Sequence, residues 1–262
     1  MPEQAQALVV RGTDWSETSR ITTLFTKEFG KIRALAKGGR RLRSNFEIAF
    51  DLLTVCQVVY LRKAHGGLDL LIEARVQERF PALRSNITAL NSGYYIAELL
   101  SDGTQDYDPH PKLFDAAIST LKSLPATAEP SLLPAGAWVR SPVSAFELVW
   151  LEELGYGPRL EECVVCGLVL PVPPLAEIRV SFSPEAGGVV CPGCQPDVRD
   201  KRPLSEPGRG ALIALQACAA GTREPLPELS PQVRAEVRAV LGHTVSTVLG
   251  RRPRLLTDVE RG

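Results

Sequence analysis

The sequence of 262 residues has no stretch of about 18 or more uncharged apolar residues, so no membrane-spanning helix is expected. Its first residues, MPEQAQ, also lack the basic group and the apolar run of a secretory signal peptide. We therefore expect a protein of the reducing cytoplasm that does not associate with membranes. In that compartment the six cysteines are expected to be free thiols or metal ligands, not disulfides.

Recognisable catalytic machinery is missing as well. The three histidines are scattered, and no phosphate-cradling glycine loop, nucleophile elbow or His-Glu-x-x-His motif occurs. The paired acids Glu152-Glu153 and Glu161-Glu162 are interpreted as solvated surface. Because no nucleophile can be paired with a base, we expect a binding protein and not an enzyme.

Net charge is also absent, since 30 basic side chains balance 30 acidic ones, and this at first argues against a nucleic-acid-binding protein. The charges are unevenly distributed, however. Residues 1–80 carry 13 basic and 9 acidic side chains, a net of +4, whereas residues 81–160 carry 5 and 9, a net of −4. The zero is therefore a cancellation between segments, and the N-terminal segment remains a candidate for binding phosphates.

The first 80 residues show the pattern of a small barrel or sandwich. Runs rich in β-branched and apolar residues, separated by turn residues, predict five short strands. They are expected at residues 7–10, 21–26, 31–37, 52–61 and 68–76. Four aromatic residues of this segment, Trp15, Phe25, Phe29 and Phe46, are candidates for base stacking, but the interpretation as core residues is favoured for each.

After residue 80 the apolar residues recur with a helical period, which predicts a helical bundle. Helices are expected at residues 86–100, 112–124, 144–154, 208–220 and 231–249, with a loop at 125–134. The last helix has the clearest boundaries, because Ser230 can cap it, Pro231 suits its first position and Gly250 suits the position after its end. A short hairpin is expected at residues 178–183 and 188–190.

Four cysteines form two Cys-x-x-Cys motifs, Cys163–Cys166 and Cys191–Cys194, with 24 residues between them. Each motif places two thiolates on one tight turn, and two such turns can close a tetrahedral zinc site. Gly167 and Gly193 suit these turns because glycine tolerates positive φ. A site of four thiolates leaves no open position for a substrate, so we predict one structural Zn²⁺ per chain with Cys163, Cys166, Cys191 and Cys194 as ligands. Redox dithiols or unpaired thiols are the alternative.

A basic run lies between positions 27 and 43, where seven cations accompany a single acid, Glu28. If residues 31–37 form a strand, the three cations Lys31, Arg33 and Lys37 share one face with Leu35. The other face is apolar and consists of Ile32, Ala34 and Ala36. Cations on that face recur about every 7 Å, which is comparable to the phosphate spacing of an extended single strand. The pattern favours a nucleic-acid-binding surface, and a merely solvated strand face is the alternative.

Several motifs spread along the chain match one known pattern. An apolar run ends at Arg11, ETSRI follows at residues 17–21, and GKIRALAKGGRR occupies residues 30–41. LGYGP at residues 154–158 precedes the first cysteine motif, and FSPEAGGVVC at residues 182–191 leads into the second. In these motifs and in the order of its segments, the chain resembles the RecO family of bacterial recombination mediators.

The resemblance implies an α+β multidomain fold, in which an N-terminal OB-fold β-barrel precedes a mainly α-helical domain with an inserted four-cysteine zinc knuckle. The corresponding segments are an OB-fold domain at residues 1–80, a first helical part at 81–157, the zinc-knuckle segment at 158–203 and a C-terminal helical part at 204–262.

The resemblance also implies binding of single- and double-stranded DNA and annealing of complementary strands. With RecR, such a protein promotes loading of RecA onto strands coated by single-strand-binding protein. The candidate DNA-binding residues are Arg11, Arg20, Lys27, Lys31, Arg33, Lys37, Arg40, Arg41 and Arg43. Some family members also have a pocket for the acidic tail of single-strand-binding protein, and Arg234 and Arg238 are a candidate for it. The alternative function is a zinc-containing protein-interaction adaptor that does not itself anneal DNA.

Overall fold

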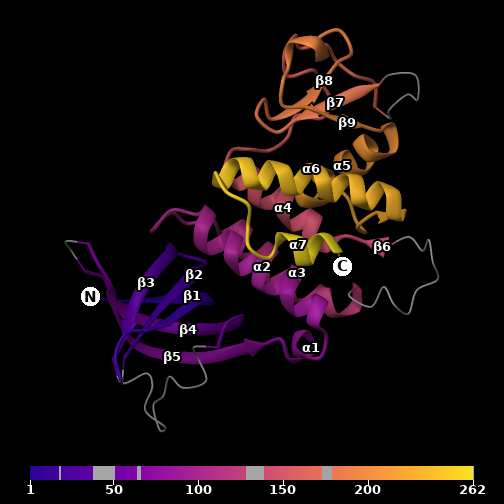
Figure 1. Ribbon diagram of the computed structural model, residues 1–262. Helices are drawn as coiled ribbons and strands as arrows, with labels where there is room; N and C mark the ends of the chain where they lie inside the picture. Colours follow the sequence, from indigo (N-terminus) through magenta and orange to yellow (C-terminus); the bar gives the residue numbers. More distant parts are fainter. Residues whose placement is uncertain (18, 38–50, 64–65, 128–138, 173–178, 262) are drawn as a thin grey trace. The chain divides into compact units, whose positions relative to one another are not determined.

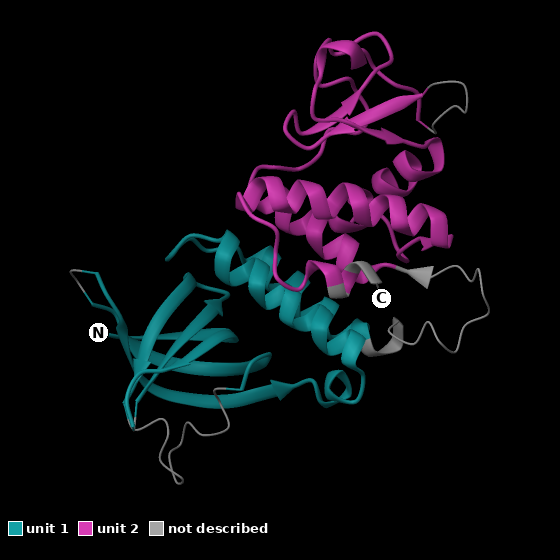
Figure 2. Cartoon of the chain, in the orientation of Figure 1, with its two compact units in different colours: residues 1–125 teal, residues 126–262 magenta. Residues whose placement is uncertain are grey.

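The computed structural model describes residues 1–17, 19–37, 51–63, 66–127, 139–172 and 179–261. They divide into two compact units, Met1–Pro125 and Ala126–Gly262 (Figure 2). Within the described ranges, the first unit holds a barrel and three helices, and the second holds four helices and two small sheets (Figure 1).

A closed five-stranded barrel forms the N-terminal part of the first unit. Its strands are β1 (Pro2–Asp14), β2 (Arg20–Thr26), β3 (Gly30–Ala36), β4 (Thr54–Leu61) and β5 (Asp69–Arg79). They follow the order β1-β2-β3-β5-β4, and β4 pairs with β1 to close the circle. All neighbours are antiparallel except β3 and β5, which pair in parallel. This topology is an OB-fold barrel, so the predicted fold class is confirmed.

Small apolar side chains fill the interior of the barrel. The interior cluster consists of Ala5, Ala7, Val9, Leu24, Ile32, Ala34, Ala36, Cys56, Val58, Tyr60, Leu71 and Ala74. Because a barrel of so few strands has a narrow interior, alanine at many inward positions lets the strands approach closely enough to close. The predicted alternation along β3 is confirmed, since residues 32, 34 and 36 are buried and residues 31, 33 and 35 are not.

A β-bulge in β1 changes which side chains point outward. Val9 lies opposite Leu24 in β2, and Arg11 lies opposite Thr23, so Val10 is the extra residue. Leu24 belongs to the interior cluster, whereas its neighbour Thr23 lies on the other face of β2. Without the bulge Arg11 would share the inward face of Val9, because residues two apart lie on the same side of a strand. The bulge therefore turns Arg11 to the outside.

Helices α2 (Ile87–Gly103) and α3 (Pro111–Thr127) pack on the outside of this barrel, and the short helix α1 (Pro81–Arg84) packs against α2. Phe25 of β2 stacks on Phe114 of α3, with ring centroids 6.4 Å apart, so the apolar outer face of β2 is covered. Helix α3 extends to Thr127, which corrects the predicted start of a loop at residue 125. The rest of that predicted loop lies outside the described residues.

The second unit is built on a helical core. Helices α4 (Pro142–Glu153), α5 (Glu206–Ala219) and α6 (Pro231–Leu249) pack together, and α7 (Leu256–Arg261) follows α6. Trp150 of α4, Leu212 of α5 and Leu241 of α6 are fully buried. One sheet joins β7 (Val180–Ser183) with β8 (Gly188–Val190) and β9 (Arg202–Leu204), and a second joins β6 (Val139–Arg140) with β10 (Glu228–Leu229).

The ends of α6 agree with the prediction. The Ser230 hydroxyl accepts a hydrogen bond from the Val233 amide at 3.3 Å, and Gly250 adopts the left-handed conformation with φ of +67°. The short elements α1, α7, β6, β9 and β10 were not predicted, because segments of so few residues show no resolvable period.

Among the described residues, no helix combines the length and the low polarity that crossing a membrane requires.

We expect Gly30→Ala to destabilise the protein far more than Gly250→Ala. Both glycines have φ near +70°, so each substitution carries the conformational cost of about 1 kcal/mol. A Cβ at Gly30 would also overlap the backbone carbonyl of Asp108, whereas a Cβ at Gly250 would meet no atom within 4 Å. The expected loss at Gly30 is about 3 kcal/mol or more in the free energy of unfolding. Denaturant titration of both variants measures the difference, and equal losses would contradict the packing of the Asp108 loop against β3.

Candidate metal centre and nucleic-acid interface

The four cysteines of the two motifs converge on one point in the second unit. The sulfurs of Cys163, Cys166, Cys191 and Cys194 all lie within 4.8 Å of one another, and Cys166 Sγ is 3.7 Å from Cys191 Sγ. A tetrahedral ion with Zn–S bonds of about 2.3 Å requires sulfurs about 3.8 Å apart. The spacing and the soft donor set therefore suit Zn²⁺, and the arrangement could hold a metal ion.

Local hydrogen bonds shape the two turns. The Gly167 amide donates to the Cys163 carbonyl at 2.9 Å, and the Cys194 amide donates to the Cys191 carbonyl at 3.0 Å. Gly167 has φ of +74°, as its predicted role requires. Gly193 does not adopt a positive φ, so the conformational reason given for it from the sequence is wrong. The second turn closes in a conformation that other residues also adopt.

The thiols of the cluster differ in their affinity for protons. Burial favours the protonated form of Cys163, but amides of Cys191, Cys166 and Val165 donate toward its sulfur and lower its pKa to about 6. One of these contacts, from the Cys191 amide, measures 3.3 Å. Hydrogen bonds with Cys166 and Cys191 raise the pKa of Cys194 to about 12. Backbone amides thus already favour a thiolate at Cys163, which is the form that a metal ion requires.

A buried arginine fastens the segment around the first motif to α5. Arg209 is only 1% exposed and donates hydrogen bonds to the carbonyls of Leu160, at 3.0 Å, and of Pro171. These carbonyls lie on either side of the first cysteine motif. The helical core and the cysteine cluster of the second unit are therefore joined by charge-assisted hydrogen bonds.

Basic side chains line a groove on the outer face of the barrel in the first unit. The bulge in β1 and the antiparallel register place Arg11, Thr23 and Arg33 in one row across β1, β2 and β3. The row borders a pocket of about 380 Å³, which we call the basic groove. Its lining residues are Arg11, Thr13, Ile21, Thr23, Lys31, Arg33, Ser101 and Asp106.

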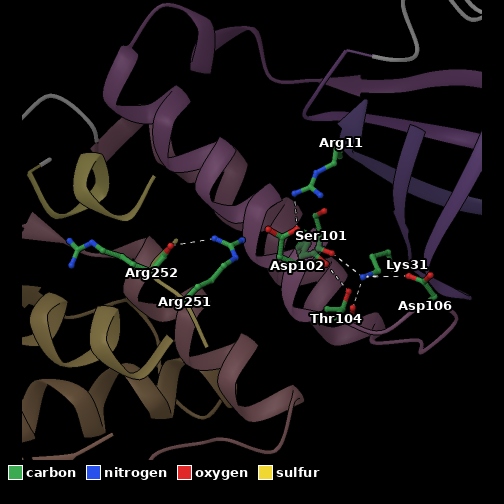
Figure 3. A network of polar contacts seen from close by, with 9 residues as sticks. Arg11, Lys31, Ser101, Asp102, Thr104, Asp106, Arg251 and Arg252 are labelled. Carbon is green, nitrogen blue, oxygen red and sulfur yellow. Dashed lines mark hydrogen bonds and ion pairs between the residues drawn. The ribbon is translucent and has the colours of Figure 1, made fainter. Parts of the chain in front are cut away.

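Lys31 is held at the end of α2. Its ammonium donates to the carbonyls of Ser101 and Thr104, at 2.9 and 2.5 Å, and lies 3.4 Å from a carboxylate oxygen of Asp106 (Figure 3). A cation is favourable at this place because the last carbonyls of a helix carry partial negative charge. The side chain is 13% exposed, so Lys31 serves mainly to hold the end of α2 beside the groove and offers little charge to a ligand.

Three further predicted cations also meet carboxylates. The Arg11 guanidinium lies 2.7 Å from Asp102 of α2, and the Lys27 ammonium lies 2.7 Å from Asp115 of α3. Arg20 lies 3.8 Å from Asp14. The helices thus place acidic groups beside the basic strands, which the charge sums of the two segments could not reveal.

Arg33 and Lys37 are the predicted cations that remain exposed and form no ion pair with the described residues. They lie along the same outer face, as the alternation predicts. The other three candidates, Arg40, Arg41 and Arg43, lie outside the described residues.

The aromatic residues divide differently from the prediction. Phe25 is buried against α3, and Phe29 meets Tyr60 edge to face, with ring centroids 6.1 Å apart. Trp15, however, is 65% exposed in the turn between β1 and β2, so its assignment to the core is wrong. Its neighbours in sequence, Asp14 and Ser16, are polar, and this signal could have indicated an exposed turn. Phe46 lies outside the described residues.

Arg238 is not part of a surface pocket. It lies between α6 and α4 with 8% of its side chain exposed, 2.5 Å from a carboxylate oxygen of the fully buried Glu147. A buried ion pair of this kind is a structural contact, so the suggestion that Arg238 receives an acidic tail is wrong. The helical period of α6 could have revealed this, because Arg238 follows the buried Val237 and stands close to Leu241 on the same stripe.

Comparison with known proteins gives consistent matches along the chain. The family model "Recombination protein O N terminal" matches residues 1–80, and "Recombination protein O C terminal" matches residues 84–257. The chain is similar to the DNA repair protein RecO of Rhodopirellula baltica, with 34% identity over 95% of this chain and 96% of the relative. It is also similar to the protein of the same name from an Anaeromyxobacter species, with 34% identity over 94% of this chain and 91% of the relative. A third relative of that name, from a Roseiflexus species, is 30% identical over 98% of this chain and 84% of the relative.

The purified protein is expected to contain one zinc ion per chain, measured by elemental analysis. Cys166→Ser should lower the zinc content, because three thiolates hold the ion less tightly than four. Cys218→Ser is the matched control, since Cys218 lies in α5 outside the cluster, and it should leave the zinc content unchanged. Metal-free protein whose four clustered thiols react freely with a thiol reagent would contradict the metal site.

Proposed function

The chain belongs to the RecO family of DNA repair proteins, and on this premise we propose that it binds single- and double-stranded DNA at the basic groove and anneals complementary strands. With RecR, it promotes loading of RecA onto strands coated by single-strand-binding protein. The observation that carries the proposal is the row of Arg11, Thr23 and Arg33 across the outer face of an OB-type barrel. The protein acts as a binding protein, without a catalytic step of its own.

The row suits the backbone of a nucleic acid. Arg11 and Arg33 lie on strands that flank β2, so their Cα atoms are about 10 Å apart. Thr23, which is 7% exposed, lines the groove between them. Annealing is opposed by repulsion between two polyanions, and cations that neutralise phosphates lower this repulsion. The exposed Lys37 continues the positive surface beyond the end of β3.

Trp15 supplies a stacking surface for an unpaired base. It lies in the β1–β2 turn, two residues after Thr13, which lines the basic groove. The turn is closed by the Trp15 amide, which donates to the Ser19 carbonyl at 3.0 Å. Loops between the strands of OB-type barrels commonly contact single strands, and an exposed aromatic ring there can stack on any base.

The metal centre has a structural role in this proposal. The four thiolates of Cys163, Cys166, Cys191 and Cys194 would close the coordination shell of Zn²⁺, which would join the two turns and leave no position for a substrate. Arg209 then fixes this segment to the helices of the second unit.

One observation favours a second function, that of a protein-interaction adaptor. Three apolar side chains in and directly after the first cysteine motif, Val165, Leu168 and Val169, are exposed at 51%, 54% and 75%. Exposed apolar side chains gathered on a small segment are typical of protein-binding surfaces. An adaptor alone would not accelerate annealing, so a strand-annealing assay separates the two functions, and adding single-strand-binding protein to it tests annealing of coated strands.

Binding of single-stranded DNA is expected to weaken steeply with salt, because each neutralised phosphate releases counterions. Arg33→Ala should weaken binding several-fold and reduce the slope of log affinity against log salt by about 0.7, the value for one lost contact to a single strand. Fluorescence anisotropy across a salt series measures both quantities. The double reversal Lys37→Glu with Arg41→Glu should weaken binding more strongly.

Arg75→Ala provides the matched control. Arg75 lies on β5 of the same barrel, is 80% exposed in its side chain and does not line the basic groove. The Arg75→Ala variant should bind single-stranded DNA with the affinity of the wild type. Affinity that hardly changes with salt, or equal losses for Arg33→Ala and Arg75→Ala, would contradict DNA binding at the groove.

Trp15→Ala should weaken binding of single-stranded DNA about fivefold or more, since stacking on one base contributes about 1–3 kcal/mol. Trp15→Phe keeps an aromatic face and should retain most of the affinity. Binding of a blunt duplex should change little, because its bases are already stacked. A uniform loss on both substrates would argue against stacking.

A further inference from the structure

Arg11 and Lys31 both face acidic groups on the basic groove, but they are held in different ways. The Lys31 ammonium has three donors, and it meets two backbone carbonyls and the Asp106 carboxylate. Arg11 has five N–H donors and meets Asp102 through a single nitrogen, Nη2, at 2.7 Å. Its side chain is 53% exposed, so most of its guanidinium still faces solvent.

Asp102 does not line the groove, but it places an anion against Arg11, which does. Its carboxylate is 19% exposed and comes from the last turn of α2, whose end is fixed by the contacts of Lys31 (Figure 3). A carboxylate and a phosphate offer the same kind of acceptor to a guanidinium. A phosphate that takes the Nη2 hydrogen now bound to Asp102 must therefore first replace the Asp102 oxygen, and a phosphate at another Arg11 donor meets the negative charge of that carboxylate.

From these contacts we propose that Asp102 competes with the DNA backbone for Arg11 and thereby limits the affinity of the basic groove. This inference rests on the proposed binding of DNA at that groove. When a phosphate takes Arg11, the carboxylate of Asp102 loses the Arg11 contact, and the cost of breaking this contact offsets part of the gain from the new one. Both the affinity and its salt dependence are therefore lower than the number of cations in the groove indicates.

The exchange suits a protein that anneals strands and then passes them on. A strand held by a row of fully available arginines dissociates slowly, because each contact adds to the affinity. Because the Asp102 carboxylate can replace the phosphate at Arg11, the contact between Arg11 and the DNA backbone is easily broken. Arg33, which has no such partner among the described residues, supplies the contact that Asp102 does not regulate.

Asp102→Asn tests the inference, since the amide keeps the shape of the side chain and removes its charge. Affinity for single-stranded DNA should rise about two- to fivefold at low salt, and the slope of log affinity against log salt should steepen by about 0.7. Asp102→Ser is a second neutral variant, and thermal unfolding of each variant shows that the fold is retained.

A double-mutant cycle with Arg11→Ala distinguishes competition from a general effect of charge. Under competition, the gain from Asp102→Asn disappears when Arg11 is alanine. Asp106→Asn is the matched control, because it removes an acid from the same groove and leaves the Arg11–Asp102 contact in place. The change in DNA affinity caused by Asp106→Asn should be the same in the wild-type and in the Arg11→Ala background.

The outcomes separate the inference from the function on which it rests. If Asp102→Asn binds like the wild type while Arg33→Ala weakens binding, the groove binds DNA and the competition is refuted. A gain that persists in the Arg11→Ala background also refutes it. If the wild type shows no salt-dependent binding at all, the proposed function itself fails.

Discussion

The parallel pairing of β3 with β5 is the constraint on which the arrangement of the first unit depends. Only three residue pairs form it, Ala34–Asp69, Leu35–Leu70 and Ala36–Leu71. Asp69, 1% exposed, accepts hydrogen bonds from the Lys63 amide, at 3.1 Å, and from the Tyr107 hydroxyl. Burial and the hydrogen bond to Asp69 raise the pKa of Tyr107, so its hydroxyl keeps the proton that it donates. The Tyr107 amide in turn donates to the Lys31 carbonyl at 2.9 Å, which holds the segment after α2 against β3. Closure of the barrel therefore also decides where α2 ends and which acids face the basic groove.

The second unit relies on polar contacts where its apolar core is small. The segment between the two cysteine motifs has short strands and a small buried core around Phe182 and Val189, and small modules of this kind depend on a metal or on cross-links for stability. Arg209 extends this principle, because its buried guanidinium joins the segment to α5 through two carbonyls. The pair of Arg238 and Glu147 does the same between α6 and α4. Such pairs gain their energy only when both partners are present, so they specify one arrangement of the helices more than they add stability.

The basic residues of the barrel serve different purposes despite their similarity in sequence. Lys31 stabilises the end of a helix, Arg11 is shared between an acid and the groove, and Arg33 is open to a ligand. A count of positive charge in residues 1–80 therefore overstates the number of cations available to DNA. It also misses Thr23, which lies between two arginines and carries no charge. The balance between basic strands and acidic helices, and not the net charge, defines the candidate interface.

Features that depend on neighbouring residues could be predicted from the amino-acid sequence. The strands of the barrel, the limits of α6, the alternation along β3 and the two cysteine turns all follow from local chemistry, because caps, pleats and tight turns involve residues within a few positions of one another. The motifs also sufficed to indicate the family. Other features became visible only in three dimensions: a bulge turns Arg11 outward, Lys31 meets α2, Arg238 is buried and Trp15 is exposed. The partners of Arg11, Lys31 and Arg238 lie 70 or more positions away along the chain, and no local pattern encodes which of them closure and packing bring together.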